Sequence, residues 1–479
     1  MAPMRSDRLR GEALAAVAGL AAALSLTGAS TSAWAHAAER AFVLLLPTGY
    51  ALAGGTLTVA LTFLILVAVP QAPVRRLVRA ETTLGAFPYT PGGTLSAVSF
   101  LALALLVVAG FLGTRDPLRN PLPLTVWTLW WGGLTVAHAL FGNLWAAINP
   151  WMAPVRLLRN MLRISNPPFT YPRRLGYWPA ALTFLAFAWF ELVDPAPDQP
   201  TRLALAVVGY SCATIAGMLT FGERAWLARA EAFAVFFRFV ALISPIQIDS
   251  GRRVRIVLPG AALARQEGLP LSAAVFVLLS LATVSFDGLS KTFWWLALGG
   301  INPLEFPGRT AVMMRNSLGL ILAWIVLAAA YGLASVIGCR MAGSRLPFKA
   351  CLGVLVLSIL PISIAYHAAH YLPAFLVNAQ YALIALGDPF AQGWTLLGTQ
   401  NRYATVSFLS DYHSVRILWS VQAGTIVLGH LLAVLVAHTI AVERFQPRRS
   451  VMASQVPLTL LMVAYTTFGL WLLAAPTAG

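Results

Sequence analysis

Long apolar runs separated by short polar segments repeat along most of the chain. Each run holds roughly twenty residues, the helix length that crosses the hydrocarbon core of a bilayer. The runs are continuous and do not alternate between apolar and polar residues, which favours helices over membrane strands. The predicted fold is all-α, a polytopic transmembrane helical bundle of about ten spans. The predicted spans are residues 50–69, 94–112, 124–147, 175–193, 203–221, 270–290, 316–338, 350–371, 416–440 and 457–475.

The N-terminus has the pattern of a secretory signal peptide, with basic residues before a small apolar run and an A-x-A cleavage site. Cleavage after Ala35 would leave His36 as the first residue of the mature protein. Cleavage after Ala37 would remove that histidine, and the pattern allows both. We expect residues 1–35 to be removed and residues 36–479 to form a single transmembrane helical domain.

Composition and charge agree with this picture. Hydrophobic residues make up 58% of the chain and charged residues 10%, with a mean hydropathy of +0.75. The net charge is +16, and 21 of the 33 basic residues lie in alternate loops between the spans, which is typical of cytoplasmic loops and not of a nucleic-acid site. We therefore predict a multi-pass protein of the bacterial inner membrane with a periplasmic mature N-terminus, contacts to the lipid bilayer and no nucleic-acid partner.

A cytoplasmic connection at residues 222–269 is longer than a simple loop. Arg224, Glu231 and Arg238 recur every seven residues within an apolar stretch, which predicts a helix along the inner interface with one narrow polar stripe. Residues 246–256 then alternate in the manner of a β-hairpin.

Histidines and carboxylates gather toward the predicted outer side. His367 and His370 lie three residues apart near the outer end of span 350–371, a spacing that places two side chains on one helix face. A long periplasmic loop is predicted at residues 373–413, and it ends in Asp411 and His413.

Imidazole and carboxylate groups on one side of a membrane are the ligands expected for a divalent metal ion, zinc or copper. Asp287, near the outer end of span 270–290, and Asp411 are the candidate catalytic carboxylates. Two other interpretations stay open: the histidines are interfacial residues, and Asp287 forms a local ion pair with Lys291 one helical turn later. The candidate metal ligands are His36, His367, His370 and His413.

Several nucleotide-binding and hydrolase motifs are absent from the sequence. It has no Walker A, no H-E-x-x-H and no G-x-S-x-G motif, which disfavours ATP-driven transport, zincin proteolysis and α/β-hydrolase catalysis. His138 and His430 fall at depths that leave a haem site open. The three cysteines form no C-x-x-C motif and predict no disulfide framework.

Several short sequence segments, spread over most of the mature chain, resemble those of bacterial inner-membrane proteins of the fenitrothion hydrolase type. The resemblance lies in His36-Ala37-Ala38-Glu39-Arg40-Ala41-Phe42, Leu45-Leu46-Pro47-Thr48-Gly49, Phe286-Asp287-Gly288-Leu289, Asn302-Pro303-Leu304-Glu305-Phe306-Pro307-Gly308 and the segment from Tyr366 to Tyr371.

The resemblance implies an integral-membrane hydrolase of organophosphate aryl esters, in which a small apolar substrate loses a nitrophenol. A metal held by the outer histidines would polarise the phosphoryl group and activate water, with Asp287 or Asp411 as general base. A copper-handling permease or transporter is the alternative function. A structural subunit that docks on a membrane partner is the second alternative.

Overall fold

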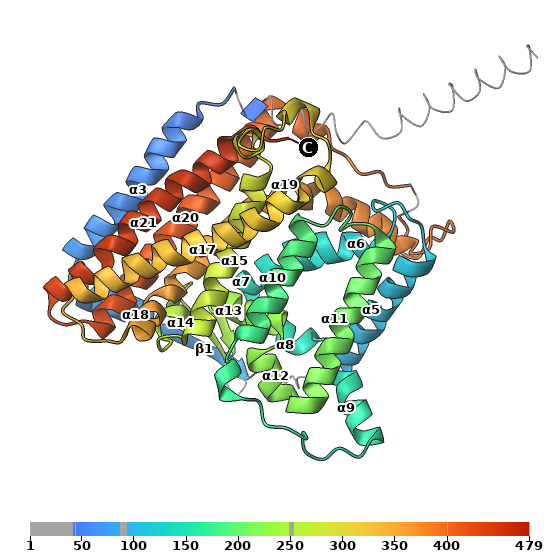
Figure 1. Ribbon diagram of the computed structural model, residues 1–479, viewed down its shortest axis with the longest axis horizontal. Helices are drawn as coiled ribbons and strands as arrows, with labels where there is room; N and C mark the ends of the chain where they lie inside the picture. Colours follow the sequence, from blue (N-terminus) through green and yellow to red (C-terminus); the bar gives the residue numbers. More distant parts are fainter. Residues whose placement is uncertain (1–41, 44, 87–92, 249–252, 400, 479) are drawn as a thin grey trace, which may run out of the picture.

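The protein is described from a computed structural model at residues 42–43, 45–86, 93–248, 253–399 and 401–478. Helices dominate these ranges and run side by side in a bundle (Figure 1). The predicted all-α fold is therefore confirmed. The predicted signal peptide and His36 lie outside the described residues.

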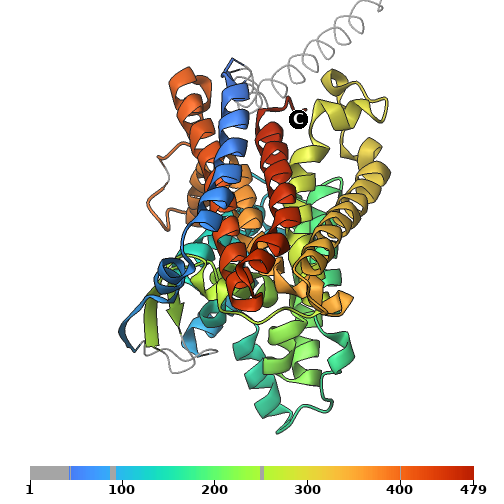
Figure 2. The same cartoon turned by 90° about the vertical axis from the view of Figure 1, so that its left-hand side faces the viewer.

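Across the described ranges, eight helical segments are long and apolar enough to cross a membrane. Each coincides with one of the predicted spans, which supports a multi-pass membrane protein. The central segment is 83% buried in its most apolar window, whereas the first is 6% buried and runs along the outside of the bundle, in blue in Figures 1 and 2. In chain order the eight are α3 (Thr48–Ala68), α5 (Thr94–Leu112), α11 (Pro200–Phe221), the central α15 (Leu271–Ser290), α17 (Arg309–Met341), the run Phe348–Gly387, α20 (Tyr412–Arg444) and α21 (Arg448–Ala474).

The other two predicted spans, 124–147 and 175–193, are helical but shorter. The first becomes an unbroken helical run of α6 (Pro121–Pro123), the π-helix η1 (Leu124–Leu134) and α7 (Thr135–Phe141), which stops at Gly142 with φ +89°. The second becomes α10 (Trp178–Leu192), whose 15 residues reach only about 22 Å. These two helices pack inside the bundle and help to position the candidate site.

Short helices and one small sheet complete the fold. Strands β1 (Glu81–Ala86), β2 (Ile246–Ile248) and β3 (Arg253–Val257) form an antiparallel sheet in the order β1-β3-β2. The predicted hairpin is confirmed by the pairing of β2 with β3, and β1 was not predicted. The remaining helices are α4 (Gln71–Arg79), α8 (Trp145–Ile148), α9 (Met152–Met161), η2 (Arg173–Leu175), α12 (Glu223–Arg229), α13 (Ala232–Ala241), α14 (Ala261–Ala264), α16 (Phe293–Ala297), α18 (Phe348–Val354), η4 (Val356–Ile359), α19 (Leu360–Gly387), η3 (Pro303–Glu305) and η5 (Ser407–Ser410).

The sheet lies in the lower half of the view in Figure 2, and several arginines form ion pairs on and beside it. Arg265 and Arg255 both pair with Glu81 of β1, and Arg79 pairs with Glu443 at the end of α20. This end of the bundle lies at the start of α15, so residues in the last turn of α15 lie at the opposite end.

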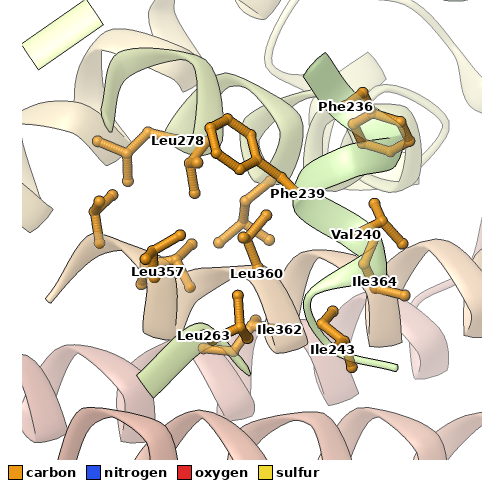
Figure 3. Packing of buried hydrophobic residues seen from close by; sticks show 14 of the residues in the cluster. Phe236, Phe239, Val240, Ile243, Leu263, Leu278, Leu357, Leu360, Ile362 and Ile364 are labelled. Atoms are coloured by element: carbon orange, nitrogen blue, oxygen red, sulfur yellow. The ribbon is translucent and has the colours of Figure 1, made fainter. Parts of the chain in front are cut away.

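The single helix predicted within 222–269 is wrong. The chain breaks into α12 and α13 because Glu231 caps α13, accepting hydrogen bonds from the backbone N–H groups of Phe233 and Ala234. Eight of the ten residues of α13 are buried, and Figure 3 shows its Phe239 beside Leu278 of α15. Glu231, the middle residue of the seven-residue repeat, is therefore a buried helix cap, whereas Arg224 is exposed and Arg238 half-buried.

The predicted loop at 373–413 begins too early, because α19 continues through Pro373 to Gly387. Proline removes the N–H that would bond the carbonyl oxygen four residues earlier, here Ala369. Gln422 of α20 takes that place, with Nε2 2.8 Å from the Ala369 oxygen. The helix therefore survives the proline, and the connection to α20 contains η5.

Candidate active site

Asp287 lies in the last turn of α15 and is only 3% exposed, with a nitrogen at each carboxylate oxygen. His370 Nε2 of α19 is 2.7 Å from Oδ2, and Lys291 Nζ is 2.6 Å from Oδ1. The local pair with Lys291 that the sequence left open is present, and His370 joins it. A buried carboxylate with two such partners keeps its charge at a tolerable desolvation cost.

A second carboxyl group, Glu191 at the end of α10, is 9% exposed and faces Asp287 across Tyr371. The Tyr371 hydroxyl oxygen lies 2.5 Å from Glu191 Oε1 and 3.2 Å from Asp287 Oδ2. Trp131 Nε1 donates to the same oxygen over 3.1 Å. We call the following five residues the carboxylate cluster: Glu191, Asp287, Lys291, His370 and Tyr371.

His367 does not share a partner with His370. It is buried, and its Nε2 lies 2.9 Å from the carbonyl oxygen of Trp131 in η1, which also accepts from the Thr135 hydroxyl. The two imidazole rings of the predicted pair therefore have different partners: His367 contacts the Trp131 carbonyl oxygen, and His370 contacts Asp287. The π-helix brings both the carbonyl and the indole N–H of Trp131 to α19, and π-helical segments are frequent at functional sites.

The other predicted site residues lie away from the cluster. Asp411 caps α20, accepting from the backbone N–H and the hydroxyl of Ser414, each at 2.8 Å. These donors lower the pKa of Asp411 below its ordinary value. His413 is exposed in the first turn of α20. Among the residues that the structure describes, no three His, Cys, Asp or Glu side chains gather to hold a metal ion.

Two cavities flank the carboxylate cluster. The smaller has a volume of about 440 Å³ and is lined by Glu191 and Asp287. The larger has a volume of about 610 Å³ and is lined by His370 together with mainly apolar side chains of α15, α19, α20 and α21. Lys291 and Tyr371 line both cavities, so the cluster forms the wall between them.

The deeper histidines make contacts typical of helix packing. His138 Nδ1 lies 2.6 Å from the oxygen of Leu134, and its Nε2 accepts from the backbone N–H of Trp145. His430 Nδ1 lies 2.9 Å from the oxygen of Ile426 within α20. Both nitrogens of His138 are thus already bonded, which does not fit the haem ligand that its depth suggested.

Glu191 and Tyr371 were not among the predicted site residues. Glu191 is an acidic residue inside a predicted span, and ionisable residues in spans are functional candidates by default. That signal was present in the sequence. Nothing in the sequence pattern places Tyr371 against Glu191, because the two are 180 residues apart and on different helices.

No protein-family model, curated protein or solved structure matches the chain. The resemblance to fenitrothion hydrolases therefore stays a prediction.

Proposed function

We propose that the protein is an integral-membrane hydrolase of apolar phosphotriesters, with His370 as the general base. The observation that carries this proposal is the 2.7 Å contact between His370 Nε2 and Asp287 Oδ2 on the wall of the larger cavity. A buried carboxylate that holds an imidazole in one tautomer is the arrangement by which hydrolases activate a nucleophile.

The tautomer follows from the contact. When the Nε2–H of neutral His370 donates to Asp287, Nδ1 carries the lone pair and can take a proton from water. Asp287 orients the ring and stabilises the imidazolium that forms. The attacking water then adds to phosphorus as hydroxide.

Lys291 supplies positive charge beside the base. Its ammonium group binds the second oxygen of Asp287, and its side chain is 43% exposed where both cavities meet. A cation fixed in this position stabilises the negative charge that develops on the phosphoryl oxygen or sulfur.

The larger cavity matches the proposed substrate in size and polarity. Ligand pockets for small organic molecules usually measure about 300–1,000 Å³ and are mainly apolar. Trp419, Leu472 and Leu473 contribute to its walls. An aryl phosphorothioate such as fenitrothion dissolves in lipid, and we propose that it enters this cavity near the outer membrane surface.

We also propose that the end of the bundle with the carboxylate cluster faces the periplasm across the bacterial inner membrane. The support is the distribution of arginines, which gather with the sheet at the opposite end. Basic residues near span ends prefer the cytoplasmic side.

Hydrolysis of a nitrophenyl phosphorothioate by the purified protein in proteoliposomes tests the proposal. We expect His370→Gln and Asp287→Asn to lower turnover roughly 10²–10⁴-fold, as for loss of a general base. Asp116→Asn, an exposed acid-to-amide change at the same end of the bundle, is the matched control and should leave turnover intact. Equal turnover in His370→Gln and in the unmodified protein would exclude His370 as the base.

A divalent metal ion, zinc or copper, stays a separate proposal. The donor set does not fit one site that includes both His367 and His370, because His367 Nε2 bonds a carbonyl oxygen and His370 Nε2 bonds Asp287. Metal analysis of the purified protein and of His413→Gln tests whether an outer histidine binds metal.

A metal-handling permease is the second candidate function. The observation that favours it is the pair of carboxyl groups, Glu191 and Asp287, set between cavities inside a helical bundle, because buried ionisable residues in spans also mark ion pathways. Copper uptake into proteoliposomes without ester turnover would favour it. A structural subunit would instead copurify with a membrane partner and show neither activity.

A further inference from the structure

The Tyr371 hydroxyl has one O–H donor and two carboxyl oxygens within hydrogen-bond distance. Its oxygen lies within hydrogen-bond distance of one carboxyl oxygen of Glu191 and one of Asp287, and it accepts from Trp131 Nε1. One O–H group donates to one acceptor at a time. If both carboxyl groups were ionised, one of them would face the tyrosine oxygen with no proton between them. A proton on one of the two carboxyl groups would remove this conflict.

The surroundings of Glu191 favour it over Asp287 as the carrier of that proton. Asp287 forms ion pairs with Lys291 and His370, whereas Glu191 forms no ion pair among the described residues and its Oε2 has no hydrogen-bond partner there. The nearby Arg309 uses its NH1 group on backbone oxygens, those of Glu191 at 2.9 Å and Asp194 at 3.1 Å. A buried carboxyl group without a cation is neutral when a like charge sits beside it.

Protonated Glu191 gives the hydrogen bonds one consistent direction. The contact between Tyr371 and Glu191 Oε1 would then have Glu191 as its donor, and the Tyr371 O–H would be free to point to Asp287 or into the larger cavity that Tyr371 lines. Tyrosine thus receives a proton from one side and offers its own on the other.

We propose that Tyr371 is the general acid of the hydrolysis and that Glu191 resupplies its proton. The proposal rests on the proposed function, and it deepens it by assigning the leaving-group side of the reaction. The smaller cavity, which Glu191 lines, is then the route by which water restores the proton of Glu191.

The protons balance over one turnover. Water adds to phosphorus, giving one proton to His370 Nδ1 and leaving the other on the phosphodiester product. The bond from phosphorus to the leaving oxygen breaks, and that oxygen takes the Tyr371 proton as Tyr371 takes the proton of Glu191. His370 then releases its proton to water in the larger cavity, and Glu191 takes one from water in the smaller cavity.

The acid defines a class of substrate. A nitrophenolate leaves readily without a proton, whereas a phenolate or alkoxide is a much poorer leaving group and gains most from general acid catalysis. The Glu191–Tyr371 pair therefore suits phosphotriesters whose leaving group is a weakly acidic phenol or alcohol, beyond the nitrophenyl esters that the resemblance implies.

Two substrates that differ only in the leaving group test the proposal: a dialkyl nitrophenyl phosphorothioate and its phenyl analogue. Tyr371→Phe and Glu191→Gln are expected to lower turnover of the phenyl ester roughly 10²–10⁴-fold and to change that of the nitrophenyl ester much less. Tyr381→Phe, on the same helix and outside the two cavity linings, is the matched control. Equal losses for both esters would show a purely structural role and overturn the proposal, as would no loss for either.

An infrared titration reports Glu191 without any ester. The protonated-carboxyl band at neutral pH is expected in the unmodified protein and in His370→Gln, and is expected to disappear in Glu191→Gln. A band that Glu191→Gln leaves unchanged would overturn the proposal even if esters are hydrolysed. If the unmodified protein hydrolyses neither ester, both the proposed function and the role of Tyr371 as general acid are wrong. The infrared band of the protonated carboxyl group then still shows whether Glu191 is protonated.

Discussion

Gln422 of α20 donates a hydrogen bond from Nε2 to the backbone oxygen of Ala369 in α19, over 2.8 Å. That oxygen has lost its usual helical donor, because the residue four positions later is Pro373. Ala369 directly precedes His370, so the same contact that allows α19 to pass the proline also holds the turn that carries the proposed base. Gln422 of α20 thereby stabilises the turn of α19 that lies beside the carboxylate cluster.

Removing this contact should destabilise the protein. In Gln422→Ala the buried oxygen of Ala369 loses its partner, which we expect to lower the free energy of unfolding by about 1–3 kcal/mol. Thermal unfolding in detergent measures the change. Gln392→Ala, at an exposed side chain, is the control and should unfold at the temperature of the unmodified protein. An unchanged melting temperature in Gln422→Ala would contradict the role of this bond.

His367 should behave as a structural residue. In His367→Ala the carbonyl oxygen of Trp131 loses one partner and the ring packing against Trp131, at 4.8 Å between centroids, is lost. We expect a loss of about 1–3 kcal/mol in unfolding free energy, with no change in metal content. If the variant is as stable as the unmodified protein but binds one metal ion fewer, His367 is a ligand and this interpretation is wrong.

Much of the fold could be predicted, because an apolar run long enough to cross a membrane predicts a helix. The predicted topology also placed Asp287 and His370 at one end of the bundle, where they meet. The predicted loop begins at residue 373 although α19 continues to Gly387, and the donor that compensates for Pro373, Gln422, lies on another span. Glu231 was assigned to a polar stripe because a helix cap and a stripe look alike in one dimension.

The candidate site could be predicted only in part. Its two ion pairs join Asp287 to Lys291 on the same helix and to His370 on a neighbouring helix. Residue spacing predicts the first pair, and hydropathy places His370 at the same end of the bundle. The link from Glu191 through Tyr371 joins residues 180 positions apart, and it depends on a π-helix that presents Trp131. Side-chain contacts between distant helices depend on packing, which a hydrophobic pattern does not encode.

The cap of α20 should respond to pH. Ser414 donates twice to Asp411 and holds the pKa of Asp411 below its ordinary value, so the ionised carboxylate stabilises the folded state. For a carboxylate with a lowered folded-state pKa, this contribution is present above the unfolded-state pKa and is lost as the pH falls through the folded-state pKa. Asp411→Ala should therefore melt below the unmodified protein at neutral pH, and the difference should shrink in acid. Melting curves over a pH series measure this, and a difference that grows in acid would contradict it.

Gly429 should tolerate no side chain, because it allows α20 to approach α19 closely. A methyl group added there would lie 2.3 Å from the Ala365 side chain and 2.8 Å from the backbone oxygen of Pro361, and a backbone atom cannot rotate away. We expect Gly429→Ala to lower the unfolding free energy by about 1–3 kcal/mol, as overpacking does, and to lower turnover by shifting the helix that carries His370. Gly424→Ala is the matched control on the same helix, since nothing lies within 4 Å of its added methyl group. Because alanine favours helix more than glycine by about 1 kcal/mol, the control should be as stable as the unmodified protein or slightly more so.

Thermal unfolding and ester turnover are measured for both variants. Equal melting temperatures and equal turnover in Gly429→Ala and Gly424→Ala would contradict the close approach of α19 and α20 at Gly429.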